Sequence, residues 1–245
     1  MLTRVHHVGL VVRRLEDGLA FWQDRLGLAV SKQATVADQG VRAALLPIGR
    51  SEIELLEPIS NAGGVGKFLE RRGEGLHHVC FETADVASEL AQARERGFPL
   101  IDQAPRPGLA GMICFLHPKG TAGVLVEFAT PPAGETSHAA HAHGPLPGLA
   151  LREVTAQSKA ARDAAALFEE RLGLARTDET TVSVGGVRLH FVAGEAEGLS
   201  GLVLELPDAA AAARTLADLG AATAGGMVRL PPERCHGVPI SIVGS

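Results

Sequence analysis

Aromatic residues are scarce in this chain of 245 residues, which contains one tryptophan and no tyrosine. Proteins that bind single-stranded nucleic acid usually stack the bases on aromatic side chains, so we do not expect a function of that class. The 23 basic and 28 acidic residues give a formal net charge of −5. This balance likewise gives no reason to expect nucleic acid or an anionic membrane as a partner.

Cysteine is also rare, and long apolar runs are missing. Cys80, Cys114 and Cys235 are an odd number without close spacing, which is typical of a reduced intracellular protein and not of a disulfide framework. No apolar stretch approaches the roughly 20 residues that cross a bilayer. A strand-like run begins within a few residues of Met1, which leaves no room for a signal peptide. We therefore expect a cytoplasmic protein with no membrane partner.

Two pairs of matched segments are the most informative feature that is present. His7 in V-H-H-V-G-L-V-V corresponds to His78 in L-H-H-V-C-F-E-T, 71 positions later (78 − 7). Glu54 in I-E-L-L-E-P corresponds to Glu127 in V-L-V-E-F, 73 positions later (127 − 54). Two copies of one unit that face each other across a local twofold axis would bring these four side chains together. Two imidazoles and two carboxylates suit a divalent transition metal.

Each copy is predicted to be a β-α-β-β-β unit. In the first copy, hydrophobic patterns predict a strand over 5–12, a helix over 15–26, and strands over 29–32, 41–47 and 51–56. A helical bridge over 66–72 leads to the second copy. That copy is predicted to have a strand over 76–83, a helix over 86–96, and strands near 99–102, 112–117 and 123–129. Gly27 and Gly97 stand where the two helices should end.

A linker and a second pair of units are predicted to follow. The segment from Pro131 to Gly148 is rich in proline and glycine and has no periodicity. Its histidines, His138, His141 and His143, are interpreted as incidental. Beyond it, L-F-E-E-R-L-G-L at 167–174 repeats F-W-Q-D-R-L-G-L at 21–28. The pattern predicts four units in two domains, residues 1–132 and 149–245, joined by a linker at 133–148.

The second domain is predicted to keep the scaffold and to lack the metal site. Aligning the repeats gives the residues that stand at the positions of His7, Glu54, His78 and Glu127: Glu153, His190, Gly201 and Ser241. Glycine offers no donor atom and serine is a poor ligand. We therefore expect one tightly bound metal per chain.

Each candidate ligand also has an ordinary explanation. A histidine in an apolar strand is more often a core residue than a ligand. Because neighbouring residues of a strand point to opposite faces, only one of His6 and His7, and one of His77 and His78, can face the site. A glutamate at the centre of a strand is usually exposed, paired or metal-bound, because burying an unpaired carboxylate is costly. The occurrence of all four at matched positions favours the metal site.

Four motifs together resemble methylmalonyl-CoA epimerase of the vicinal oxygen chelate superfamily: H-V-G-L-V-V, I-E-L-L-E-P, K-F-L-E-R-R-G-E-G-L-H-H-V-C-F-E and F-L-H-P-K-G-T-A-G-V-L-V-E-F. The resemblance covers residues 1 to about 132, and superfamily membership also fits 149–245. It implies an α+β fold of tandem βαβββ modules. It also implies metal ligation by His7, His78 and Glu127, with Glu54 completing or supporting the coordination sphere. Some members carry a further carboxylate that is proposed as the base. Its position is occupied by Ala43 in this chain.

The resemblance implies an epimerase that abstracts the α-proton of methylmalonyl-CoA or a similar acyl-CoA thioester. One divalent ion (Co, Mn, Ni or Zn) would stabilise the enolate, and Glu127, or next Glu54, would be the general base. Surface cations would hold coenzyme A, such as Lys67, Arg71, Arg72, Arg106 or Lys119. The chain would be a monomer whose second domain replaces a dimer partner, or a homodimer.

Three other functions remain open on this scaffold. A glyoxalase I-like lyase uses a similar ligand set, although the segment H-P-K-G-T-A-G-V-L-V-E-F favours the epimerase. An extradiol dioxygenase-like enzyme would carry two histidines and one glutamate, generally in the second domain, and would leave Glu54 surplus. A non-catalytic small-molecule binding protein of the same fold is the third alternative.

Overall fold

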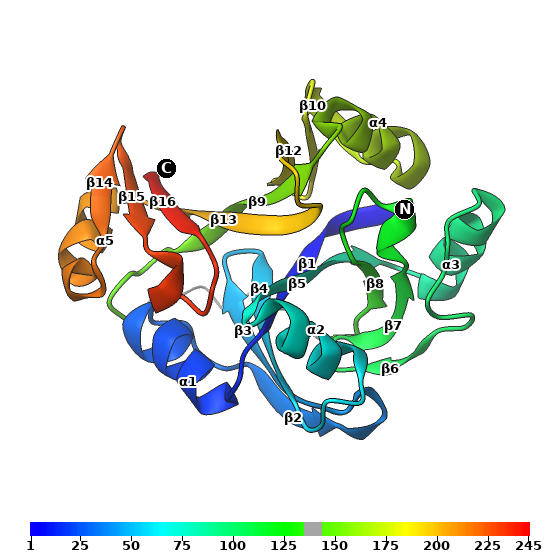
Figure 1. The fold of residues 1–245 in the computed structure, drawn as a ribbon, viewed down its shortest axis with the longest axis horizontal. Helices are drawn as coiled ribbons and strands as arrows, with labels where there is room; N and C mark the ends of the chain where they lie inside the picture. The colour runs from blue at the N-terminus through cyan, green and yellow to red at the C-terminus, as the bar shows by residue number, and fades with distance from the viewer. Residues whose placement is uncertain (135–143) are drawn as a thin grey trace. The chain divides into compact units, whose positions relative to one another are not determined.

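The computed structural model describes residues 1–134 and 144–245 of the chain (Figure 1). The central part of the predicted linker, with His138, His141 and His143, lies outside the described residues. Within the described ranges, no helix is long and apolar enough to cross a membrane.

Four successive β-α-β-β-β modules make up the chain. The first contains β1 (Leu2–Val11), α1 (Leu15–Leu19) continued by a π-helical segment (Ala20–Arg25), β2 (Lys32–Val36), β3 (Val41–Ile48) and β4 (Ser51–Pro58). After α2 (Gly64–Arg72), the second contains β5 (Gly75–Thr83), α3 (Val86–Glu95), β6 (Arg106–Gly108), β7 (Gly111–Leu116) and β8 (Val126–Thr130). The third contains β9 (Ala150–Ser158), α4 (Ala161–Leu172), β10 (Ala175–Asp178), β11 (Thr181–Val184) and β12 (Val187–Ala193). The fourth contains β13 (Gly198–Leu206), α5 (Ala209–Thr215), β14 (Ala222–Ala224), β15 (Met227–Leu230) and β16 (Ile240–Gly244).

The strands form two eight-stranded sheets with the same connectivity. The order is β2-β3-β4-β1-β5-β8-β7-β6 in the first sheet and β10-β11-β12-β9-β13-β16-β15-β14 in the second. This repeated order confirms the α+β fold of tandem βαβββ modules that the sequence predicted.

The register of the sheets also repeats. Cys80 of β5 lies opposite Glu127 of β8, in a parallel pair. Val203 of β13 lies opposite Ser241 of β16, again in a parallel pair. Cys80 and Val203 each come two residues after the positions that the alignment equates, His78 and Gly201. The register therefore supports the predicted equivalence of Ser241 with Glu127.

By compactness, the chain divides into two units that each combine parts of both halves. The first unit contains Met1–His7, the described residues from His78 to Gly134, and Glu153–Ser200. The second contains Val8–His77, residues 144–152 and Gly201–Ser245. The domain limits at 1–132 and 149–245 follow the sequence repeat and stay a prediction.

Capping residues and glycines mark the ends of the helices. Asp85 caps the N-terminus of α3, where its carboxylate accepts hydrogen bonds from the backbone amides of Ala87 and Ser88 at 2.9 and 3.2 Å. Gly27 follows the π-helical segment and Gly97 follows α3, with φ of 86° and 72°, the left-handed conformation that glycine adopts most readily.

Two strand predictions were wrong in position. The strand predicted at 29–32 lies at Lys32–Val36. The segment near 99–102 makes only an isolated bridge between Leu100 and Leu116, and β6 begins later. The reason is Asp102, whose carboxylate accepts hydrogen bonds from the Phe115 amide and from Arg106 Nε, both at 2.9 Å. A side chain therefore satisfies the amide that a paired strand would otherwise use.

We predict that the close packing of α2 makes Gly66 sensitive to substitution. A Cβ atom at Gly66 would clash with the backbone oxygen of Ser60 and lie 2.6 Å from Asn61 Cα. Gly66→Ala should therefore lower the free energy of unfolding by about 1–3 kcal/mol. Gly64 in the same helix is the matched control, because a Cβ there meets nothing within 4 Å. Gly64→Ala should be neutral or stabilise by up to about 1 kcal/mol, and equal destabilisation of both variants in urea unfolding would contradict the packing argument.

Candidate metal centre

Three donor atoms from three strands meet in the first unit. His7 Nε2 on β1 lies 2.9 Å from His78 Nε2 on β5 and 3.1 Å from Glu127 Oε2 on β8. His78 Nε2 lies 2.9 Å from the same carboxylate oxygen. The three residues are 0%, 2% and 3% exposed. These are three of the four side chains that the matched spacing selected.

The separations fit three ligands of one metal ion. For metal–ligand bonds of about 2.1 Å, neighbouring ligands of an octahedron lie about 3.0 Å apart, and those of a tetrahedron about 3.4 Å. The three measured distances are close to the octahedral value. Imidazole nitrogen and carboxylate oxygen also form a donor set typical of first-row divalent metals.

The charge state of Glu127 suits a ligand. Burial by itself would raise the pKa of this carboxyl group, but the charges and hydrogen bonds of His7 and His78 outweigh burial and lower it to about 2. Glu127 is therefore ionised at neutral pH, as metal ligation requires.

The fourth predicted residue, Glu54, belongs to β4 in the second unit. It is 6% exposed and lies opposite Leu45 of β3 in the antiparallel register. Ala43, where some family members carry a carboxylate, is fully buried opposite Leu56. Sequence reasoning did not single out Glu52, which is buried two residues before Glu54 and lies 3.2 Å from the Ser31 hydroxyl. The alternation Glu52-Ile53-Glu54 was the available signal, because it places both carboxylates on one face of a strand.

The two histidine pairs behave differently. In the second pair, His77 packs edge-on against the ring of Phe68, with 5.0 Å between ring centroids. In the first pair, His6 Nδ1 lies 2.9 Å from His7 Nδ1. His6 therefore contacts a candidate ligand on the side of its ring that faces away from His78 and Glu127.

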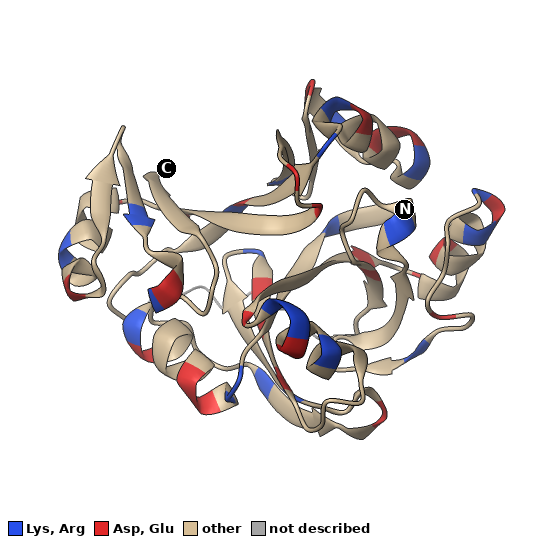
Figure 2. Ribbon diagram, in the orientation of Figure 1, with Lys and Arg blue, Asp and Glu red and all other residues tan. Residues whose placement is uncertain are grey.

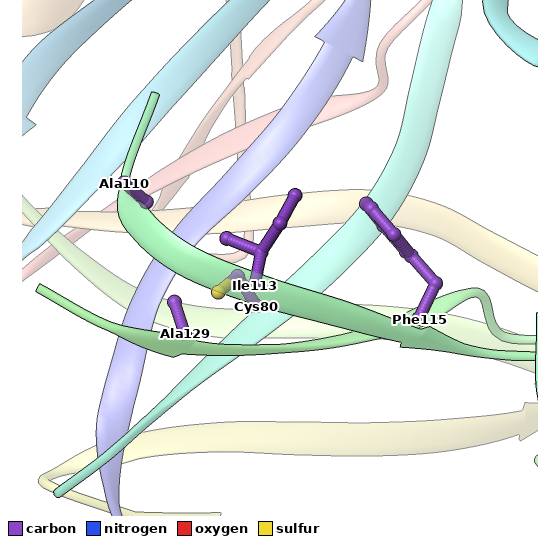
Figure 3. Packing of buried hydrophobic residues seen from close by; sticks show 5 residues of the cluster. All are labelled: Cys80, Ala110, Ile113, Phe115 and Ala129. Atoms are coloured by element: carbon purple, nitrogen blue, oxygen red, sulfur yellow. The ribbon is translucent and has the colours of Figure 1, made fainter. Parts of the chain in front are cut away.

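An apolar cluster lies beside the donor atoms. It is formed by small and aromatic residues of β5, β7, β8 and the turn before β7 (Figure 3): Cys80, Ala110, Ile113, Phe115 and Ala129. The Phe115 ring contacts the His78 ring edge-on, with 5.4 Å between centroids. Cys80 and Ala129 come two residues after His78 and Glu127, so they share the ligands' faces of their strands. The cluster therefore gives the site an apolar wall on the side of Phe115, where a low dielectric strengthens electrostatic interactions.

The three cysteines are buried and form no disulfide. Burial raises the pKa of the Cys114 and Cys235 thiols to about 12, so neither is a nucleophile at neutral pH. The expectation of cysteines without a disulfide framework is confirmed.

The cations expected to hold coenzyme A fall into two groups. Lys67, Arg71 and Arg72 are exposed on α2, and Lys119 is exposed after β7. Figure 2 shows the basic stretches of α2 in blue. Arg106 is half-buried, pairs with Asp102 at 2.9 Å, and places its guanidinium 5.5 Å from the centroid of the Phe115 ring. Through Phe115, Arg106 adjoins the His78 ring.

In the third module, an internal ion pair takes the place of a metal site. Glu153, at the position of His7, is buried and lies 2.7 Å from the Arg188 guanidinium and 3.2 Å from His190 Nδ1. A guanidinium is a permanent cation at neutral pH. The carboxylate is therefore neutralised by the chain itself, which supports the prediction of one metal per chain.

We predict that His78→Ala removes metal binding and that His77→Ala does not. His78 supplies one of three donors, so its loss should weaken metal affinity by more than about 100-fold, beyond the effect of losing a residue that only orients a ligand. The measurement is chelator competition on purified full-length protein, with circular dichroism as the control for folding. Undiminished metal content in folded His78→Ala would contradict the site.

We also predict a stoichiometry of one metal per chain. Elemental analysis of the wild-type protein should give one divalent ion, and Glu153→Gln should leave that number unchanged because Arg188 already neutralises Glu153. Glu127→Gln, the same substitution at a candidate ligand of the first half, should lower it. Two ions in the wild type, or a loss of metal in Glu153→Gln, would show that the second half also binds metal.

The first half of the chain is similar to known proteins. The family model described as glyoxalase/bleomycin resistance protein/dioxygenase superfamily matches residues 6–115. The ethylmalonyl-CoA/methylmalonyl-CoA epimerase of Cereibacter sphaeroides is 32% identical over 130 residues, which are 52% of this chain and 97% of that protein.

Two solved structures are similar over about half of the chain. A methylmalonyl-CoA epimerase in complex with methylmalonyl-CoA and NH4+ is 38% identical, with a TM-score of 0.54 and 56% of this chain and 99% of that chain covered. A variant of the Streptomyces coelicolor methylmalonyl-CoA epimerase in complex with 2-nitronate-propionyl-CoA is 38% identical, with a TM-score of 0.53 and 54% and 100% covered. On these matches, the chain belongs to the glyoxalase/bleomycin resistance protein/dioxygenase superfamily.

Proposed function

We propose that this protein is a cytoplasmic, metal-dependent epimerase of methylmalonyl-CoA or a similar acyl-CoA thioester. The observation that carries the proposal is the buried donor set of His7, His78 and Glu127, with mutual distances of 2.9–3.1 Å. It occurs in a chain whose relatives include methylmalonyl-CoA epimerases.

His7, His78 and Glu127 would hold the metal, and Glu54 would complete or support its coordination. A divalent ion supplies a Lewis acid that stabilises negative charge on the thioester oxygen as the α-proton leaves. Side chains of the site would take up and return the proton.

Glu127, or next Glu54, is the candidate for the general base. The charges and hydrogen bonds of His7 and His78 lower the pKa of Glu127, so its carboxylate is ionised and can serve both as a ligand and as a proton acceptor. Epimerisation further requires that a proton return to the opposite face of the planar carbanion, so the residue that removes it need not be the residue that restores it.

Arg106 is the first candidate for contact with the charged part of the acyl-CoA. Its guanidinium stacks on Phe115, which contacts His78, and a planar guanidinium can bind a carboxylate or a phosphate with two hydrogen bonds. The exposed cations of α2 and Lys119 would then attract the coenzyme A phosphates as point charges.

The architecture of the whole chain is part of the proposal. Residues 1–132 would be the catalytic domain, 133–148 the linker and 149–245 a domain without a metal site. The chain would work as a monomer or as a homodimer, which light scattering on the purified protein would distinguish.

We predict that the metal-loaded protein exchanges the α-proton of methylmalonyl-CoA with deuterium. Exchange in deuterated water, followed by proton NMR, should exceed the uncatalysed rate and should stop when a chelator removes the metal. Glu54→Gln should slow exchange by about 10²- to 10⁴-fold, as expected for loss of a general base.

Metal content separates the roles in the same set of variants. Glu127→Gln should lose both metal and exchange. Ser241→Ala, the matched change in the second half, should keep both. A metal-loaded wild type that exchanges nothing above background would remove the epimerase proposal and leave a glyoxalase-like or binding function.

A further inference from the structure

Both ring nitrogens of His7 are engaged. Its Nε2 faces His78 and Glu127 at 2.9 and 3.1 Å. Its Nδ1 faces His6 Nδ1 at 2.9 Å, and the two rings meet edge-on at 85° with centroids 5.1 Å apart. His6 is 3% exposed. A buried imidazole is thus held against the far side of a candidate metal ligand.

The proton on His7 decides whether its ring can bind a metal. A neutral imidazole carries one proton, and the nitrogen that binds a metal must offer a free lone pair. If Nε2 is the ligand atom, the proton is on Nδ1 and needs an acceptor there. His6 Nδ1 is at hydrogen-bond distance and accepts when His6 carries its own proton on Nε2. In the reverse arrangement His6 would donate to His7, and His7 would direct an N–H at Glu127.

We propose that His6 is a positioning residue, which accepts a hydrogen bond from His7 Nδ1–H and thereby fixes the tautomer and orientation in which His7 binds metal. The inference rests on the proposed metal site and adds a residue to it. The orienting acceptor behind a ligand histidine is usually a carboxylate, a backbone carbonyl or a water. A neutral imidazole fulfils this task without adding another charge to a buried site.

The second histidine pair offers a comparison for the first. The corresponding residue of the second pair, His77, packs its ring against Phe68. The first histidine of each pair thus has a different contact: His6 contacts His7, and His77 contacts Phe68. His77 therefore provides a control for His6.

One competing arrangement involves the same ring. Donor atoms of His6, His7 and Cys80 lie within 4.8 Å of one another and could themselves surround an ion. An ion bound through the Nδ1 lone pair of His7 would exclude the hydrogen bond from His7 to His6. The two arrangements are distinguished by the number of ions bound and by the position of the proton on His7.

The first experiment compares His6→Leu with His6→Asn in the full chain. Leucine fills similar space without an acceptor, whereas the asparagine side-chain oxygen stands close to the place of Nδ1 and can accept. Chelator competition with Co²⁺ should show about 10- to 100-fold weaker binding for His6→Leu, the usual effect of losing such an orienting group. His6→Asn should regain most of that loss, and His77→Leu should match the wild type. Equal affinity of His6→Leu and wild type would overturn the proposal.

The second experiment needs no metal. Long-range ¹⁵N–¹H NMR of the metal-free wild type should show the His7 proton on Nδ1, and His6→Leu should shift the ring toward the Nε2–H tautomer. A wild-type His7 with its proton on Nε2 would overturn the proposal, as would a second ion that is lost in Cys80→Ser. A wild type that binds no Co²⁺ would instead remove the metal site, and the NMR result would still decide the direction of the hydrogen bond.

Discussion

The site depends on the compensation of charge that is buried between strands. A carboxylate with 3% exposure is costly to bury unless charges or hydrogen bonds replace water around it. Glu127 obtains this compensation from two imidazoles that contact one of its oxygens. Those imidazoles come from β1 and β5, which are the first strands of two successive modules. The pairing and register of the first sheet therefore serve to bring together groups that neither module could bury alone.

The second half solves the same problem with a different counter-charge. Glu153 stands at the position of His7 and is also buried, but Arg188 reaches it from β12 at 2.7 Å. The strand order and register repeat between the halves, so the difference is confined to the side chains of equivalent strand positions. The same scaffold thus compensates a buried carboxylate in two ways. The histidines of the first half leave room for a metal ion, whereas the arginine of the second half needs no added ion.

Sequence reasoning could predict most of the fold because the repeats supply independent copies of each signal. The strand over 5–12, the helix over 86–96 and the glycines that end the helices were all recovered within one to three residues. The strand near 99–102 could not be predicted correctly, because the side chain of Asp102 satisfies the Phe115 amide in its place. A pattern of apolar residues carries no information on which polar side chain will take over a backbone hydrogen bond.

The candidate site likewise has residues that the sequence predicted and contacts that it did not. Matched spacing found His7, His78 and Glu127, because a duplicated pattern survives in the sequence. It could not find the contact of His6 with His7, since the alternation rule places neighbouring side chains on opposite faces and ignores the reach of a ring nitrogen close to the backbone. The buried carboxylate of Glu52 was missed because a charged residue at a strand end is usually exposed.

The ion pair of Glu153 with Arg188 has a consequence for how the stability of the two halves responds to solution conditions. A site completed by a dissociable ion makes folding depend on the concentration of that ion, by mass action. A site completed by a guanidinium carries its counter-charge in the chain at a fixed ratio of one to one. Thermodynamic linkage to metal would therefore be confined to the modules that carry His7 and His78, while the third module would stay indifferent to metal supply.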